Sequence, residues 1–169
     1  MPPVQIDINK LADFILHIKQ IRPTIDRKSN HFAFICKKKL TYENIVAFST
    51  NFIPVNARTK SIHAEHGCYE QLLKKLRLAK HRKIKRKNKK ERYVMFAAKM
   101  SPTCTIGNSR PCLGCILDTI KINSDIDLNI KIDVIYYTYS DEISFKENFD
   151  EMCKSNQNRF SSGDNRKCN

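Results

Sequence analysis

The chain has 169 residues, of which 41% are hydrophobic and 28% are charged, a balance typical of a folded domain that excludes a disordered chain. This length fits one domain with a single buried core. The net charge of +14 is concentrated, because twelve of the nineteen residues 74–92 are Lys or Arg and one is Glu. Such a basic block is typical of contacts with nucleic acid or another polyanion.

The cysteines and the N-terminal residues favour a reducing compartment. The seven cysteines are irregularly spaced, and no basic segment followed by an apolar run opens the chain. The apolar stretch 11–18 is far too short to span a bilayer, so we expect no membrane contact. The sequence therefore favours metal ligands and buried thiols over a disulfide framework, in a protein kept in the cytoplasm or nucleus and not secreted.

The first half of the chain predicts helix, two strands and helix. Helical spacing of apolar residues favours a helix over about 10–21, closed by Pro23. The β-rich runs 31–35 and 45–53, joined by a polar link, predict a hairpin. A second amphipathic helix is expected to begin near His63.

The second half alternates strands with helices. We expect a strand over 93–100, a loop over 101–110, a helix opening at Pro111 in its first turn, a strand over 130–140 and a last helix over 143–152. Strands separated by helices imply crossover connections, and these favour an α/β sandwich.

Two short motifs carry the chemistry, and each stands at a predicted helix start. The first is His63-Ala64-Glu65 and the second is the Pro-Cys-Leu-Gly-Cys run 111–115. A Cys-x-x-Cys pair at a helix start points both sulfurs the same way, where the helix dipole favours thiolates. With one imidazole, Cys112 and Cys115 give three ligands for Zn²⁺ and leave a fourth position open for water.

Glu65 is the candidate catalytic residue. It follows the ligand His63 by two positions, so it is badly placed as a ligand but well placed beside a water at the open position. One carboxylate can then move protons in both directions as general base and general acid. A structural zinc site would favour a second Cys-x-x-Cys, which this sequence lacks.

The combined pattern H-x-E…P-C-x-x-C resembles that of the zinc nucleobase deaminases, the cytidine deaminase superfamily. The resemblance extends from Leu11 to about Asp150 and implies a cytidine-deaminase-like α/β/α sandwich around a mixed sheet of four to five strands. The fifth strand is either missing or beyond residue 140. We expect one domain over 1–153, with the basic segment 74–92 inserted in it, and a polar tail over 154–169.

The resemblance also implies substrate contacts. An Asn before the His-Ala-Glu helix would contact the sugar, and Asn51 matches better than the alternative Asn56. Further candidates are Ala64, Ser109 and Arg110, the last reaching a phosphate. The separation of 49 residues between the first and second ligands is long for the family. The run 108–112 and the tyrosine pair 136–137 are similar to deaminase-like proteins of large DNA viruses.

These observations predict a zinc-dependent deaminase acting on cytosine in single-stranded polynucleotide. One alternative is a free nucleoside or deoxycytidylate deaminase, for which the resemblance implies a homo-oligomer. The other is a non-catalytic, zinc-stabilised nucleic-acid-binding protein. Cytosine against adenine, and DNA against RNA, stay open.

The nucleic-acid contacts are expected in the basic segment, which also fits a nuclear-import signal or a solvated face. Lys37, Lys38 and Lys39 are expected to extend it. The candidate contacts are Lys80, Arg82, Lys83, Lys85, Arg86, Lys87, Lys89 and Lys90.

The remaining His and Cys residues near the motifs are expected to be bystanders. His66 is interpreted as an exposed or pocket-rim histidine rather than a ligand. Cys68 shares the apolar face of its helix, which is typical of a small core residue. Cys104 lies in the loop before the second motif.

Overall fold

A computed structural model describes residues 4–5, 30–40, 42–51, 62–80, 90–100, 106–140 and 143–154. The strands are β1 (Val4–Gln5), β2 (Asn30–Lys37), β3 (Ile45–Thr50), β4 (Glu91–Met100), β5 (Ile106–Gly107), β6 (Ile130–Ser140) and β7 (Ile143–Asn148). The helices are α2 (Ala64–Lys80), α3 (Leu113–Ser124) and α4 (Phe149–Lys154), with a 3-10 turn η1 (Tyr42–Asn44).

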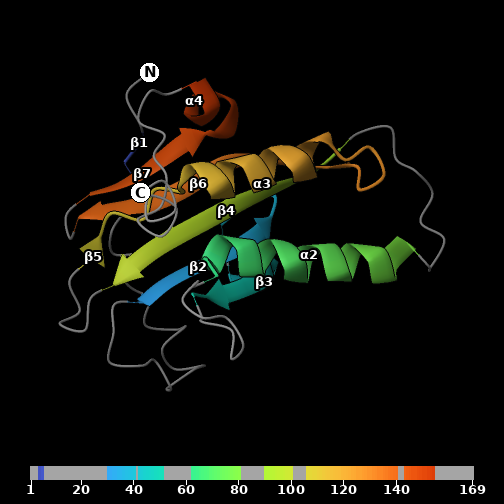
Figure 1. Ribbon diagram of the computed structural model, residues 1–169, viewed down its shortest axis with the longest axis horizontal. Helices are drawn as coiled ribbons and strands as arrows, with labels where there is room; N and C mark the ends of the chain where they lie inside the picture. Colours follow the sequence, from blue (N-terminus) through green and yellow to red (C-terminus); the bar gives the residue numbers. More distant parts are fainter. Residues whose placement is uncertain are drawn as a thin grey trace, which may run out of the picture.

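The strands form one mixed sheet in the order β1-β7-β6-β4-β2-β3, with the two-residue β5 pairing β4 (Figure 1). β4 and β6 are parallel, whereas every other described pair is antiparallel. The predicted α/β fold with a mixed sheet is confirmed. The sheet has more strands than the expected four to five, because β1 and β5 add two short pairings that have no hydrophobic pattern of their own.

The central strands are apolar on both faces, as expected of strands covered from two sides. In β2, Ala33 and Ile35 point to one face while Phe32, Phe34 and Cys36 point to the other, and all five are at most 2% exposed. β4 alternates in the same way and pairs with β2 along its whole length. Because both of its faces are buried, the middle of the sheet is closely packed on both sides.

Helices α2 and α3 lie side by side on one face of the sheet and begin at the same end of it (Figure 1). α2 buries Ala64, Cys68 and Leu72, which are spaced by four residues and so form one stripe. α3 contributes Cys115, Ile116 and Ile122, among other buried residues. The core between the helices and the sheet therefore fixes where each helix begins.

The other face of the sheet carries a second core cluster. The rings of Phe34 and Phe96 stack across the β2–β4 pair with centroids 4.7 Å apart. The helix predicted over residues 10–21 lies outside the described residues, as do residues 155–169 of the expected tail.

The helix predicted over 143–152 is wrong in its first six residues, which form β7. β7 pairs antiparallel with β6, and β1 pairs with the opposite edge of β7. Ladder hydrogen bonds to β6 outweigh the weak helical pattern of this segment. The helix begins only after Asn148, whose Oδ1 accepts a hydrogen bond from the Asp150 N–H at 2.9 Å. β7 thus adds a strand beyond residue 140.

Smaller differences concern segment ends. β3 ends at Thr50, earlier than the expected Ile53. β5 occupies two residues of the segment expected to be a loop. Helix α3 begins at Leu113, so Pro111 lies before the helix and not in its first turn. In the part of the chain that the structure describes, no helix combines the length and apolarity needed to cross a membrane.

Candidate metal centre

The two motifs meet because α2 and α3 start next to each other. His63 directly precedes α2 and its carbonyl accepts the Gly67 N–H at 3.1 Å. Cys112 is the N-cap residue of α3 and its carbonyl accepts the Ile116 N–H at 3.0 Å. Both side chains are therefore set by the first turn of a helix that the core holds in place.

The three candidate ligand atoms form a small triangle. His63 Nδ1 lies 3.4 Å from each of Cys112 Sγ and Cys115 Sγ, and the two sulfurs are 3.7 Å apart. With Zn–S near 2.3 Å and Zn–N near 2.0–2.1 Å, tetrahedral angles place two sulfurs about 3.8 Å apart and nitrogen about 3.6 Å from sulfur. The donor triangle has the size that zinc requires.

Among the described residues, His63, Cys112 and Cys115 form the one group of three or more His, Cys, Asp or Glu side chains whose ligand atoms lie close enough together to hold a metal. The three predicted ligands are thus brought together, and the metal's identity rests on the donor set. Two sulfurs and one imidazole favour zinc over magnesium or calcium, which prefer oxygen ligands. Three protein donors leave one tetrahedral position open.

The cysteine pair is polarised even without a metal. The hydrogen bond shared with Cys115 lowers the pKa of Cys112 to about 4, and the nearby His63 acts in the same direction. That same hydrogen bond, together with burial, raises the pKa of Cys115. The lowered pKa favours the thiolate form of Cys112, which is the form of cysteine that binds a metal.

Glu65 lies in the first turn of α2 and is 6% exposed. Burial raises its pKa, whereas its backbone hydrogen bond and the nearby His63 lower it. Interactions with both cysteines place its carboxylate beside the ligand triangle. A buried carboxylate next to an open ligand position is where a proton acceptor for bound water would stand.

A buried hydrogen-bond network holds the backbone of Cys115, one of the two cysteine ligands. The Thr119 hydroxyl on α3 donates to the Cys115 carbonyl at 2.9 Å, and the Tyr69 hydroxyl on α2 donates to Thr119 Oγ1 and lies 3.4 Å from the same carbonyl. Both side chains are at most 2% exposed. The network ties α3 to α2 one turn behind the ligands, a role that the sequence pattern gave no sign of.

Asn51 and His31 lie beside the centre. The Asn51 Oδ1 accepts the His31 N–H at 2.9 Å, and the Asn51 N–H donates to the His31 carbonyl at the same distance. Burial, together with the charges of Lys99 and His63, lowers the pKa of His31 to about 4. His31 faces Lys99 across the β2–β4 pair. The sequence analysis singled out Asn51 but missed both His31 and Lys99.

The other predicted substrate contacts have structural partners. The Ser109 hydroxyl donates to the Ala97 carbonyl at 2.8 Å and also hydrogen bonds with Thr138. Arg110 contacts Glu147 at 3.3 and 3.4 Å, and its side chain is 10% exposed. These contacts favour a role in shaping the loop before α3, so the predicted contacts of Ser109 and Arg110 with substrate stay predictions.

Ala64 and Asn56 complete the predicted set. Ala64 is 1% exposed, with its side chain in the core below the centre. Because Ala64 is the first residue of α2, its backbone N–H is one of those that have no hydrogen-bond partner within the helix. Asn56 lies outside the described residues.

The bystander histidine and cysteine behave as expected. His66 Nδ1 lies 3.0 Å from Asp118 Oδ2 and its side chain is 43% exposed, away from the ligand triangle. Cys68 is fully buried and its thiol donates to the Ala33 carbonyl at 3.0 Å. Cys104 lies outside the described residues.

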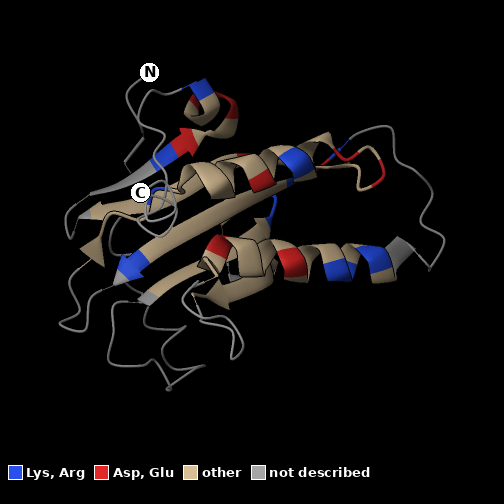
Figure 2. Cartoon of the chain, in the orientation of Figure 1, with Lys and Arg blue, Asp and Glu red and all other residues tan. Residues whose placement is uncertain are grey.

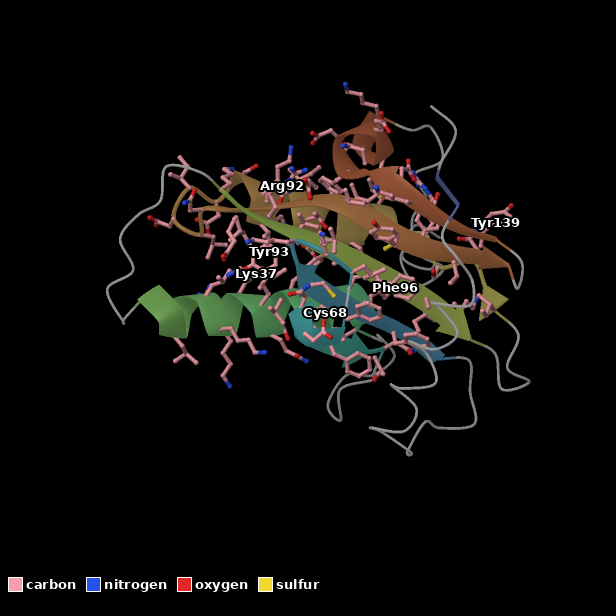
Figure 3. All side chains as sticks on the ribbon, turned by 180° about the vertical axis from the view of Figure 1, so that it is seen from behind. Lys37, Cys68, Arg92, Tyr93, Phe96 and Tyr139 are labelled. Carbon is pink, nitrogen blue, oxygen red and sulfur yellow. The ribbon has the colours of Figure 1, made fainter. Side chains whose placement is uncertain are left out.

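The basic segment joins the two motifs in sequence but departs from the far end of the sheet. It leaves α2 at Lys80 and re-enters the sheet at Lys90, whose Nζ donates to the Asn123 carbonyl at 2.6 Å. In Figure 3, Lys37 and Arg92 lie toward this end and Tyr139 lies at the other. Six of the predicted nucleic-acid contacts, from Arg82 to Lys89, lie outside the described residues.

Comparison of this chain with protein-family models, with curated protein sequences and with solved structures finds no significant match. The chemistry of the centre itself therefore carries the functional assignment.

Proposed function

We propose that the protein is a zinc-dependent hydrolytic deaminase that converts cytosine to uracil, with a single-stranded polynucleotide as its substrate. The observation that carries the proposal is the donor triangle of His63, Cys112 and Cys115, which has the size for tetrahedral zinc and has the buried Glu65 beside its open position. A closed structural site would fill that position with a fourth protein ligand.

His63 and both cysteines would hold the ion through Nδ1 and two thiolate sulfurs. When bound, zinc lowers the pKa of a water at the fourth position toward neutrality. Glu65 would accept the proton that a water loses when its oxygen adds to C4 of the base. The carboxyl group then passes the proton to the N3 ring nitrogen and transfers the water's second proton to the departing amine, so cytosine and water give uracil and ammonia.

The charge distribution supports a polynucleotide substrate. Twelve basic side chains within nineteen residues supply affinity for phosphates that is independent of sequence and falls with salt. A base in a single strand reaches a zinc pocket without first being extruded from a duplex, which favours single-stranded substrate.

A free nucleoside or nucleotide substrate is the second candidate. It is favoured by one observation: the basic segment leaves the sheet at the end opposite the ligand triangle, so the part described does not line the centre. Removing the charges of residues 82–89 separates the two, because only the polynucleotide enzyme would lose activity.

The direct test is base conversion, measured by mass spectrometry on single-stranded DNA, duplex DNA, RNA and free nucleotides. Zinc-loaded protein should convert cytosine in single-stranded polynucleotide. Glu65→Ala should lower the rate by about 10²–10⁴-fold because the proton carrier is lost, while the variant keeps its zinc.

Glu151→Ala is the matched control, since it removes an exposed carboxylate on α4 and should leave the rate unchanged. Conversion of free nucleotides alone would move the assignment to the second candidate. Loss of conversion in every substrate class, with one zinc bound per chain, would contradict deamination and favour a zinc-stabilised nucleic-acid-binding protein.

A further inference from the structure

A groove of about 660 Å³ lies between α2 and α3 on the side away from the sheet. Its walls are apolar at Leu73, Leu78 and Ile122, and three cations, Lys74, Arg77 and Lys121, stand along it. Leu78 is 61% exposed, although it is a large apolar residue in the middle of a charged helix face. The groove thus offers both apolar surface and positive charge.

The groove runs lengthwise along the helices. It begins at His66, one turn after the ligand His63, and continues on α2 to Arg77 and Leu78 near the other end. Figure 2 shows acidic residues toward the start of α2 and basic residues toward its end. The groove therefore starts in the first turn of α2, which follows His63, and ends two residues before Lys80, where the basic segment leaves the helix.

A second basic feature stands at the far end. Lys75 Nζ donates to the Val46 carbonyl at 2.5 Å, and the neighbouring Ile45 pairs with Cys36 near the end of β2. Because α2 continues from Lys75 to Lys80, its last turn extends past the level of Cys36. Beyond it come Lys38 and Lys39, both exposed, in the turn after β2. Among the described residues, neither ammonium makes an ion pair. We call Lys38 and Lys39 the basic corner.

The acidic side chains in the groove contact neighbouring histidine and lysine side chains. Asp118 contacts His66 at 3.0 Å and Lys121 at 3.5 Å. Glu70 contacts His66 at 3.5 Å. Glu43 is the exposed acid nearest in sequence to the basic corner. Lys74 and Arg77 have no such partner in the part of the chain described, so they remain available to phosphates.

We propose that this groove is the track of the nucleic-acid strand, which rests on the basic corner and leads along α2 to the metal centre. The inference rests on the proposed function, because it names the path of the substrate to that same site. The cations would contact phosphates, and the apolar walls would contact bases, in the manner of single-strand binding channels.

The track fixes a minimum substrate length. α2 rises 1.5 Å per residue, so His63 and Lys80 lie about 25 Å apart along the helix. A strand with the 3.4 Å spacing of stacked nucleotides needs about seven nucleotides to cover that distance. Shorter oligonucleotides reach the metal centre or the basic corner, but not both.

The test is a binding titration of the full chain with fluorescent oligothymidylates of 3–15 nucleotides over a range of salt concentrations. Affinity should rise with length to about seven nucleotides. Lys74→Gln with Arg77→Gln should raise the Kd of a 12-mer by roughly tenfold at low salt and reduce the salt slope by about 1.4, since each single-strand phosphate contact contributes about 0.7. Lys154→Gln on α4 is the matched control and should change neither quantity.

Lys121→Gln, on the opposite wall, provides an independent variant if the double variant unfolds, and should lower the slope by about 0.7. Equal effects from the groove and control variants, or an affinity that does not depend on length, would overturn the track. Because binding is read without turnover, the outcomes separate. The same variants are then assayed on a 12-mer that contains cytosine: a strand that is bound but not converted refutes deamination and keeps the groove, whereas conversion that is unaffected by the groove variants refutes the groove alone.

Discussion

His31 is the residue beside the candidate metal centre whose ionisation has the clearest consequence for stability. Its pKa is lowered to about 4 by burial and by the charges of Lys99 and His63, against an ordinary value of 6.5. Between pH 6.5 and pH 4 the unfolded chain therefore binds a proton there that the folded chain does not bind. The free energy of unfolding must fall as the pH falls through this range.

We expect this fall to disappear in His31→Gln, which cannot titrate. Urea unfolding of the metal-free wild type and the variant, compared at pH 7, 6, 5 and 4.5, measures the difference. The wild type should lose stability relative to the variant by at most about 3 kcal/mol across the range. Parallel pH profiles for the two proteins would show that His31 titrates normally in the folded state.

Sequence identified the residues of the centre that depend on local structure. His63, Glu65, Cys112 and Cys115 are placed by the first turns of two helices, and helix starts can be recognised from spacing and motif. His31 and Lys99 are neighbours only because β2 pairs with β4 in one register. That register depends on contacts between distant parts of the chain, which a single sequence does not reveal.

At the scale of elements, the contact between α2 and α3 depends on one buried network. Tyr69→Phe removes a hydroxyl that bonds Thr119 and the Cys115 carbonyl. The variant should lose about 1 kcal/mol of unfolding free energy, and zinc affinity should fall by about tenfold because Cys115 is held less firmly. Urea unfolding and chelator competition measure the two effects. Wild-type zinc affinity in this variant would limit the network to a structural role.

The outer edge of β3 is closed by α2 side chains. Gln71 donates to the Phe48 carbonyl at 2.6 Å and accepts the Phe48 N–H at 3.3 Å, while Lys75 covers the Val46 carbonyl. These are backbone groups that an edge strand otherwise offers to another chain. Gln71→Ala with Lys75→Ala should therefore promote self-association, measured by sedimentation velocity. Lys74→Ala, on the same helix, is the control, and equal behaviour of the two variants would contradict the idea.

The element-level predictions failed where a strand was specified by its neighbours. The segment 143–148 has helix-compatible spacing, yet it pairs with β6 and receives β1 on its other side. The strands β2, β4 and β6 were predicted because β-branched and aromatic residues filled both faces. Helix α2 was predicted because one apolar stripe and the metal motif agree on its start.

At the scale of the whole molecule, the candidate metal centre and the exit of the basic segment lie at opposite ends of α2. The ligand triangle stands where α2 and α3 begin, and the basic segment leaves where α2 ends. Sequence order suggested the opposite, because residues 74–92 lie between the two ligand motifs. β4 explains the difference, since it carries the chain from Glu91 at the far end back to Met100 before the second motif begins.

The central claim is that His63, Cys112 and Cys115 hold a zinc ion with one position open to water. X-ray absorption at the zinc edge of the loaded protein tests it most directly. We expect one zinc per chain, with two sulfur neighbours near 2.3 Å, one imidazole nitrogen, and one further light ligand that is exchangeable. A zinc with four protein ligands, or a chain that binds none, would contradict the open site and the deaminase chemistry built on it.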